Sequence, residues 1–225
     1  MTRRELLAST LTGVIGASVR TRVAAQTRTQ TLDLGALADR NALAVFNRTP
    51  NRITEAGRSG LRLSEHEGDG VAYVPGTDLA SGTIEIDIRG KDVVQQSFVG
   101  VAFHGVDSTT YDAVYFRPFN FKAADPVARS HAVQYHSMPT FTWQKLRSEQ
   151  PGKYEQAVNP VPDPNGWFRA RLVIAGPTVR AFVNGAADPC LTVSLLNDRK
   201  KGLVGLWTGN NSGGDFANLT ITGAG

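Results

Sequence analysis

Residues 169–185 read RARLVIAGPTVRAFVNG, with two runs of alternating apolar and polar residues on either side of Gly176-Pro177. Successive side chains of a β-strand point to opposite faces, so each run predicts a strand with one apolar face. The Gly-Pro pair predicts the turn of a β-hairpin. The side chains expected to face the core are Phe168, Ala170, Leu172 and Ile174 on the first strand and Val179, Ala181 and Val183 on the second.

The same kind of pattern extends over most of the chain from about Leu32 onward. Short runs of β-branched, aromatic and aliphatic residues are separated by Gly, Pro, Asn and Asp, without a long helical periodicity. We expect strands over residues 42–46, 61–64, 70–74, 82–89, 97–104, 111–117, 131–138, 167–175, 178–184, 190–196, 203–208 and 215–222. This pattern predicts an all-β protein with two antiparallel sheets packed face to face, or a barrel. Segments 119–129 and 139–164 do not alternate cleanly and are expected to be loops.

The first 25 residues have a different character. They combine a basic start, an uncharged stretch over residues 6–19 and small residues at positions 23–25, which is typical of a removable export signal. Arg3-Arg4 followed by Glu5-Leu6-Leu7 resembles the twin-arginine signal. We therefore expect an export signal over residues 1–25, a linker over 26–40 and one β-sandwich domain over 41–225, in a bacterial protein that is periplasmic or secreted. The alternative for the first segment is a disordered basic arm.

Charge and cysteine content exclude several classes of function. The chain of 225 residues has a net charge of +4, and the first 25 residues hold four arginines and one glutamate, so the remainder is nearly neutral. Its one clear basic cluster is Arg199-Lys200-Lys201, which is too small to predict nucleic-acid binding. Cys190 is the single cysteine, so no internal disulfide and no cysteine-based metal site can form. We expect no metal, no cofactor and no membrane association after signal cleavage, and the oligomeric state stays open.

Residues 111–121, YDAVYFRPFNF, predict a strand with two chemically different faces. Val114 and Phe116 share one face, whereas Tyr111, Tyr115, Arg117 and Phe119 share the other. The same alternation places Gly100, Ala102 and His104 on the open face of residues 97–104, and Gln134 and His136 on the open face of residues 131–138. Asp112 falls on the apolar side, so its burial would require a partner such as Arg129 or a backbone amide.

Five segments together resemble a known superfamily. They are GTIEIDIRG (82–90), FVGVAFHG (98–105), YDAVYFRPFNF, GWFRARLVIAGPTVRAFVNG (166–185) and GLVGLWTGNNSGGDFANLTIT (202–222). They resemble the concanavalin A-like lectin and glucanase superfamily, and within it the branch with the 3-keto-disaccharide hydrolase domain. The resemblance covers most of residues 40–222. It implies a curved two-sheet jelly roll whose concave face or rim holds carbohydrate, in members that are catalytic, lectin-like or adhesive.

The open faces of the three strands predict one site. Aromatic rings stack on the C–H faces of sugars while planar polar groups bond to vicinal hydroxyls, and Trp143 supplies a further platform at the rim. Arg117 either binds the ligand or clamps a carboxylate such as Glu155. Trp167 and Trp207 are expected to be packing residues. The catalytic candidates are His104, His136 and Arg117, and the substrate-binding candidates are Tyr111, Tyr115, Gln134, Trp143 and Glu155.

Two catalytic motifs are only partly present. Glu85-Ile86-Asp87 resembles the family 16 glucanase signature, but Arg89-Gly90 stands where the third carboxylate should be. Gln134-Tyr135-His136 resembles the Gln-x-His motif of jelly-roll alginate lyases, whose arginine-rich early strand is missing here. We therefore expect an exported jelly-roll protein that engages carbohydrate. Its role stays open between a glycoside hydrolase or lyase and a non-catalytic lectin-like binding module, and a third alternative is a purely structural domain.

Overall fold

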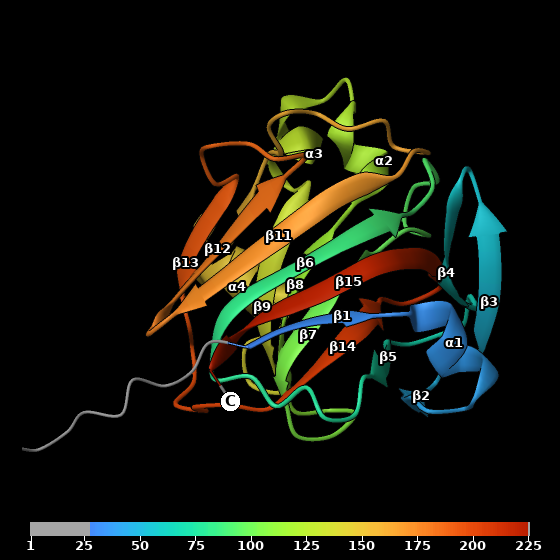
Figure 1. Cartoon of the computed structure of the whole chain (residues 1–225). Helices are drawn as coiled ribbons and strands as arrows, with labels where there is room; N and C mark the ends of the chain where they lie inside the picture. The colour runs from blue at the N-terminus through green and yellow to red at the C-terminus, as the bar shows by residue number, and fades with distance from the viewer. Residues whose placement is uncertain (1–27, 225) are drawn as a thin grey trace, which may run out of the picture.

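A computed structural model describes residues 28–224 of the chain, which form two packed sheets (Figure 1). The eight-stranded sheet has the order β13 (Leu191–Ser194), β12 (Thr178–Val183), β11 (Phe168–Ala175), β6 (Ser81–Arg89), β15 (Gly214–Ala224), β4 (Arg58–Leu63) and β3 (Pro50–Glu55), with β1 (Arg28–Leu32) also paired to β15. The seven-stranded sheet has the order β10 (Glu155–Gln156), β9 (Val133–Met138), β8 (Tyr111–Phe116), β7 (Val99–Gly105), β14 (Leu203–Thr208), β5 (Gly70–Tyr73) and β2 (Ala44–Phe46). Every pairing is antiparallel, which confirms the predicted two-sheet sandwich.

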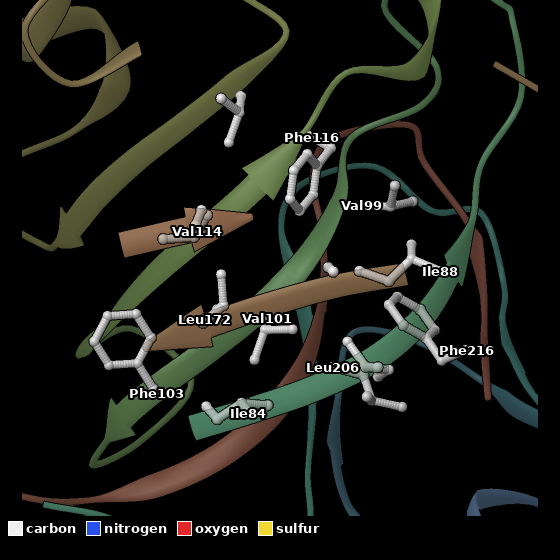
Figure 2. Close-up of a cluster of buried hydrophobic side chains, with 14 of the residues drawn as sticks. Ile84, Ile88, Val99, Val101, Phe103, Val114, Phe116, Leu172, Leu206 and Phe216 are labelled. Atoms are coloured by element: carbon white, nitrogen blue, oxygen red, sulfur yellow. The ribbon is translucent and has the colours of Figure 1, made fainter. Parts of the chain in front are cut away.

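The main core lies between the two sheets. Figure 2 shows side chains of both sheets pointing toward one another, among them Ile84 and Leu172 from one sheet and Val101 and Phe116 from the other. The predicted hairpin forms as β11 and β12, and all seven of its expected core side chains are buried. Burial of this apolar surface is the main source of stability. The described residues contain no disulfide that would add to it.

The outer face of the seven-stranded sheet carries a second apolar cluster. Its buried members are Val71, Tyr73, Ala102, Tyr111, Ala113, Tyr115 and Trp207. Alternation along β8 sends Val114 and Phe116 into the main core and Tyr111 and Tyr115 into this second cluster, as expected. Gly100 is required beside it, because an added Cβ would lie 2.5 Å from the Cα atom of Tyr115.

The N-terminal part of the chain differs from the prediction. Residues 28–40 were expected to be a linker, but β1 pairs with β15 and α1 (Leu34–Asp39) buries Leu34 against the core. Asp33 caps this helix, since its Oδ1 accepts a hydrogen bond of 2.9 Å from the N–H of Ala36. The predicted export signal over residues 1–25 lies outside the described residues and stays a prediction.

The two segments that were expected to be loops contain short helices. These are α2 (Pro118–Phe121), α3 (Pro126–Ser130) and α4 (Trp143–Glu149). Helices of four to seven residues are too short to show a periodic apolar pattern, and their N-terminal signals, Pro118, Asp125-Pro126 and Thr142, also occur in turns. No helix in the described part of the chain is long and apolar enough to cross a membrane.

The packing predicts a large difference between two phenylalanines. Phe116 is 0% exposed and its ring centroid lies 5.0 Å from that of Phe168, whereas Phe46 is 40% exposed. Phe116→Ala should lower the free energy of unfolding by about 3–5 kcal/mol, because it leaves a cavity in the core. Phe46→Ala is the matched control and should cost less than about 1 kcal/mol. Urea unfolding curves measure both changes, and equal losses would contradict this description of the core.

Candidate functional site

A cavity of about 480 Å³ lies over the outer face of the seven-stranded sheet. Tyr115 of β8, His136 of β9 and Trp207 of β14 are among its lining residues, and each is buried in the sheet. Met138, the last residue of β9, also lines it, and the other lining residues belong to adjoining segments and to α4, namely Gly68, Asp69, Gln95, Phe98, Arg117, Thr142, Trp143, Gln144, Arg147, Gly209 and Asn210. The volume is in the range of small-molecule sites.

Aromatic rings in close contact form the floor of the cavity. The ring centroids of Tyr115 and Trp207 are 4.7 Å apart, and that of His136 lies 5.3 Å from Tyr115 and 5.2 Å from Trp207. Trp143, the first residue of α4, is 39% exposed at the rim. The guanidinium of Arg147 lies 5.0 Å from its ring centroid, one helical turn further along α4. Trp143 is thus a lining residue whose ring stays partly exposed.

Arg117, Gln134 and Tyr115 form a buried polar network beside this floor. Arg117 Nη2 donates to the Tyr115 hydroxyl at 2.8 Å and also to Gln134 Oε1, which accepts the Tyr115 hydroxyl proton at 2.8 Å. Arg117 Nη1 donates to the carbonyl of His131 at 2.7 Å. Burial lowers the pKa of Arg117 and raises the pKa of Tyr115 to about 12. The structure thus brings three of the predicted residues together, although Gln134 lies behind the lining.

Glu155 anchors the arginines from behind the cavity and does not line it. Its carboxylate accepts hydrogen bonds from Arg147 Nε at 2.9 Å and from Arg147 Nη2 at 2.6 Å. His131 Nε2 lies 3.3 Å away and Arg117 Nη1 lies 4.0 Å away. Of the two roles considered for Glu155, the geometry favours the structural clamp, and the bidentate partner is Arg147.

His136 lies on the floor in an apolar environment. Burial lowers its pKa to about 3, and the charge of Arg117 adds to this effect. The imidazole is therefore neutral near pH 7. Its Nε2 is sealed from solvent and has no hydrogen-bond partner among residues 28–224.

His104 does not share this face, so its expected position is wrong. The pairing of β7 with β14 contains a bulge between Leu203 and Gly205, and His104 has a left-handed φ of 49°. The bulge changes the alternation, and His104 Nδ1 lies 3.5 Å from Asp112, on the opposite side of the sheet from Tyr111. Its Nε2 lies 3.2 Å from the carbonyl of Ala80.

Asp112 is the centre of a separate buried polar cluster. It accepts hydrogen bonds from the Tyr135 hydroxyl at 2.6 Å, from Asn197 Nδ2 at 2.7 Å and from Arg199 Nη2 at 3.1 Å. Burial alone would raise the pKa of this carboxyl, but these contacts together lower it. The expected need for a partner is correct, but Arg129 is not that partner, because its Nη1 donates to the carbonyl of Ala123.

Asp69 is a lining residue that sequence reasoning missed. Its Oδ2 lies 3.4 Å from the Tyr111 hydroxyl, which accepts a hydrogen bond of 3.0 Å from Trp207 Nε1. Asp69 is an exposed residue, yet neighbouring protein atoms partly desolvate its carboxyl and raise the pKa of this group. Tyr111 itself lies beneath the lining and supports it.

Like Asp69, several other lining residues lie outside the strands, so the sequence pattern did not reveal them. Gln95, Gln144, Arg147 and Asn210 lie in loops or on a short helix, where no alternation marks them. Trp207 was expected to be a packing residue, and it does pack, but its ring also lines the cavity. No group of three or more potential metal ligands occurs within residues 28–224.

Comparisons with known proteins bear on the fold. No protein family model matches the sequence, and no curated protein matches it. A solved structure of the carbohydrate-binding module CBM66 from Bacillus subtilis is similar at a TM-score of 0.57 and 14% identity, over 80% of this chain and 95% of that chain. A Bacillus subtilis protein of unknown function with a galectin-like fold is similar at a TM-score of 0.58 and 13% identity, over 87% and 94%. The lumenal domain of VIP36 in a Ca²⁺/Man3GlcNAc-bound form is similar at a TM-score of 0.52 and 7% identity, over 81% and 84%.

These likenesses extend over nearly the whole of each matched chain at low sequence identity, so they concern the arrangement of the strands. Together with the two antiparallel sheets described above, they show that this chain has the concanavalin A-like jelly-roll fold.

Proposed function

We propose that this protein binds carbohydrate in the cavity over the seven-stranded sheet, as a lectin-like module. The observation that carries the proposal is the half-exposed Trp143 ring above a floor of Tyr115, His136 and Trp207. Sugars present flat C–H faces that pack on aromatic rings, and hydroxyls that need donors and acceptors in the same site. Asp69 supplies acceptors and Arg117 supplies donors at the same cavity.

The similar structures support the same proposal. One of them is named as a carbohydrate-binding module, and another holds a mannose-containing oligosaccharide. Fold alone does not assign a function, so the proposal depends on the side chains of this cavity.

A second candidate function is catalysis on a glycoside, and His136 is the observation that favours it. A neutral imidazole on the floor of a cavity is in the form that accepts a proton during elimination or hydrolysis. Asp69 is the one carboxylate among the lining residues, whereas glycoside hydrolysis by two carboxylates needs a pair. An enzyme built on this site would therefore use His136 as its base, with Arg117 and Asp69 orienting the sugar. His104 does not line the cavity and lies beside Asp112 instead.

Removal of the rim platform tests carbohydrate binding. Trp143→Ala should weaken binding of a short oligosaccharide about tenfold, because the lost ring contact is worth about 1.4 kcal/mol. Trp167→Ala is the matched control, since the Trp167 ring lies between Arg58 and Arg89 and does not line the cavity. Glycan-array screening followed by titration calorimetry measures both variants. Equal affinity in Trp143→Ala and the native protein would contradict the proposed role of this platform.

The low pKa of His136 predicts a pH dependence of stability. The pKa falls from 6.5 to about 3 on folding, so the unfolded chain holds one more proton between these values. The free energy of unfolding therefore rises with pH across this window, by up to about 1.4 kcal/mol per pH unit from this group. His136→Asn should remove that contribution, while His66→Asn, on an exposed loop, should not. Unfolding curves between pH 4 and 7 measure this dependence in all three proteins. If the free energy of unfolding changes with pH at the same slope in all of them, His136 is not buried as described.

Turnover separates the two candidate functions. If the protein is an enzyme, His136→Asn should lower turnover of a bound glycoside by about 10²–10⁴-fold while sugar affinity changes little. If it is a binding module, the native protein should bind sugar without releasing product. Product analysis on the sugars that bind best distinguishes these results, and turnover retained by His136→Asn would exclude the imidazole as acid or base.

A further inference from the structure

The charges at one end of the cavity cancel. Asp69 lines the cavity, and the buried guanidinium of Arg48 lies behind it. Burial lowers the pKa of Arg48, and the negative charge of Asp69 opposes part of that decrease. Arg48 makes its own hydrogen bonds to neutral oxygens, among them Thr208 Oγ1 at 2.7 Å and the carbonyl of Gly209 at 2.8 Å. This end therefore has one positive and one negative charge.

The charges at the other end do not cancel. Arg117 and Arg147 both line the cavity, and Glu155 is the one carboxylate that they share. His131 also contacts Glu155, but burial lowers its pKa and it adds little charge near neutral pH. Two guanidinium groups therefore face one carboxylate, which leaves an excess of one positive charge beside the cavity.

Donors remain available at this positively charged end. The hydrogen bonds of Arg117 use its two Nη atoms, and those of Arg147 use Nε and Nη2. Arg117 Nε and Arg147 Nη1 have no acceptor in the described part of the chain. A buried guanidinium without a full set of acceptors is stabilised by an anionic ligand.

We propose that the cavity selects an acidic sugar, with the carboxylate of a uronic acid unit beside Arg117 and Arg147 and with sugar hydroxyls beside Asp69. The inference rests on the carbohydrate-binding function proposed above and adds the class of sugar. Arg117 Nε and Arg147 Nη1 each lack an acceptor within the described residues, and a carboxylate offers two oxygens, one for each of these donors. The balanced charges at the Asp69 end set the direction in which the sugar lies.

Matched pairs of sugars test the inference on the native protein. The probes are methyl glycosides and short oligomers of glucuronate, galacturonate and mannuronate, each paired with the neutral sugar of the same configuration. At least one uronate should bind about tenfold tighter than its neutral partner, as expected for one charge-assisted contact. The preference should shrink between about 0.01 and 0.5 M salt, and it should disappear for the methyl ester of the same uronate.

Two variants of α4 test the charge directly. Arg147→Met removes the excess charge, keeps an apolar chain on the Trp143 ring and leaves Glu155 with Arg117. The preference for the uronate should therefore be lost, while the neutral sugar should still bind. Lys145→Met removes one charge from the same helix without reaching the cavity, since Lys145 Nζ lies over the Phe141 ring, and it should keep the preference. Circular dichroism and unfolding curves confirm that both variants are folded.

The outcomes separate this inference from the proposed function. A neutral sugar that binds as tightly as every uronate would overturn the inference and leave carbohydrate binding intact. A sulfated sugar that binds while the uronates do not would overturn the assignment of a carboxylate. If none of the acidic or neutral sugars binds at millimolar concentration, both proposals fail.

Discussion

The central strands of the seven-stranded sheet bury both of their faces, and the rest of the structure depends on this constraint. Every residue of β7 and β8 is buried. A side chain in these strands must therefore find partners either between the sheets or under the loops and α4 on the outer face. Apolar side chains fill the first space, and aromatic and polar side chains fill the second. The cavity lies where this second layer is incomplete.

Polar groups on such a sheet need partners, because water does not reach them. The two faces meet this need differently. Asp112, on the side of the main core, has enough donors to keep its carboxylate charged, although His104 Nδ1 and Arg199 Nε beside it have no hydrogen-bond partner among residues 28–224. The network of Arg117 and Gln134 lies on the outer face. The two clusters differ in access, because Arg117 and Arg147 line the cavity and Asp112 does not.

Rigidity of the network also serves the proposed function. Arg117 is held by the Tyr115 hydroxyl, by Gln134 and by the carbonyl of His131, and Arg147 is held by Glu155. A ligand that meets groups already fixed in position loses less of its binding energy to ordering the protein. Trp143 lies on α4, the same helix as Arg147, so the platform at the rim and the charge beside it are positioned together.

The sequence by itself determined the elements that follow from alternation. It predicted the all-β class, the hairpin around Gly176-Pro177 and the division of residues 111–117 into a core face and an open face, because side-chain direction in a strand depends only on position. Only the tertiary structure decided which groups meet. The bulge that turns His104 toward Asp112 and the pairing of β1 with β15 depend on strands distant in the chain. Asp69 and Tyr111 are 42 residues apart, and Tyr111 and Trp207 are 96 residues apart. Such contacts form only when the strands of the seven-stranded sheet pair, so no local pattern records them.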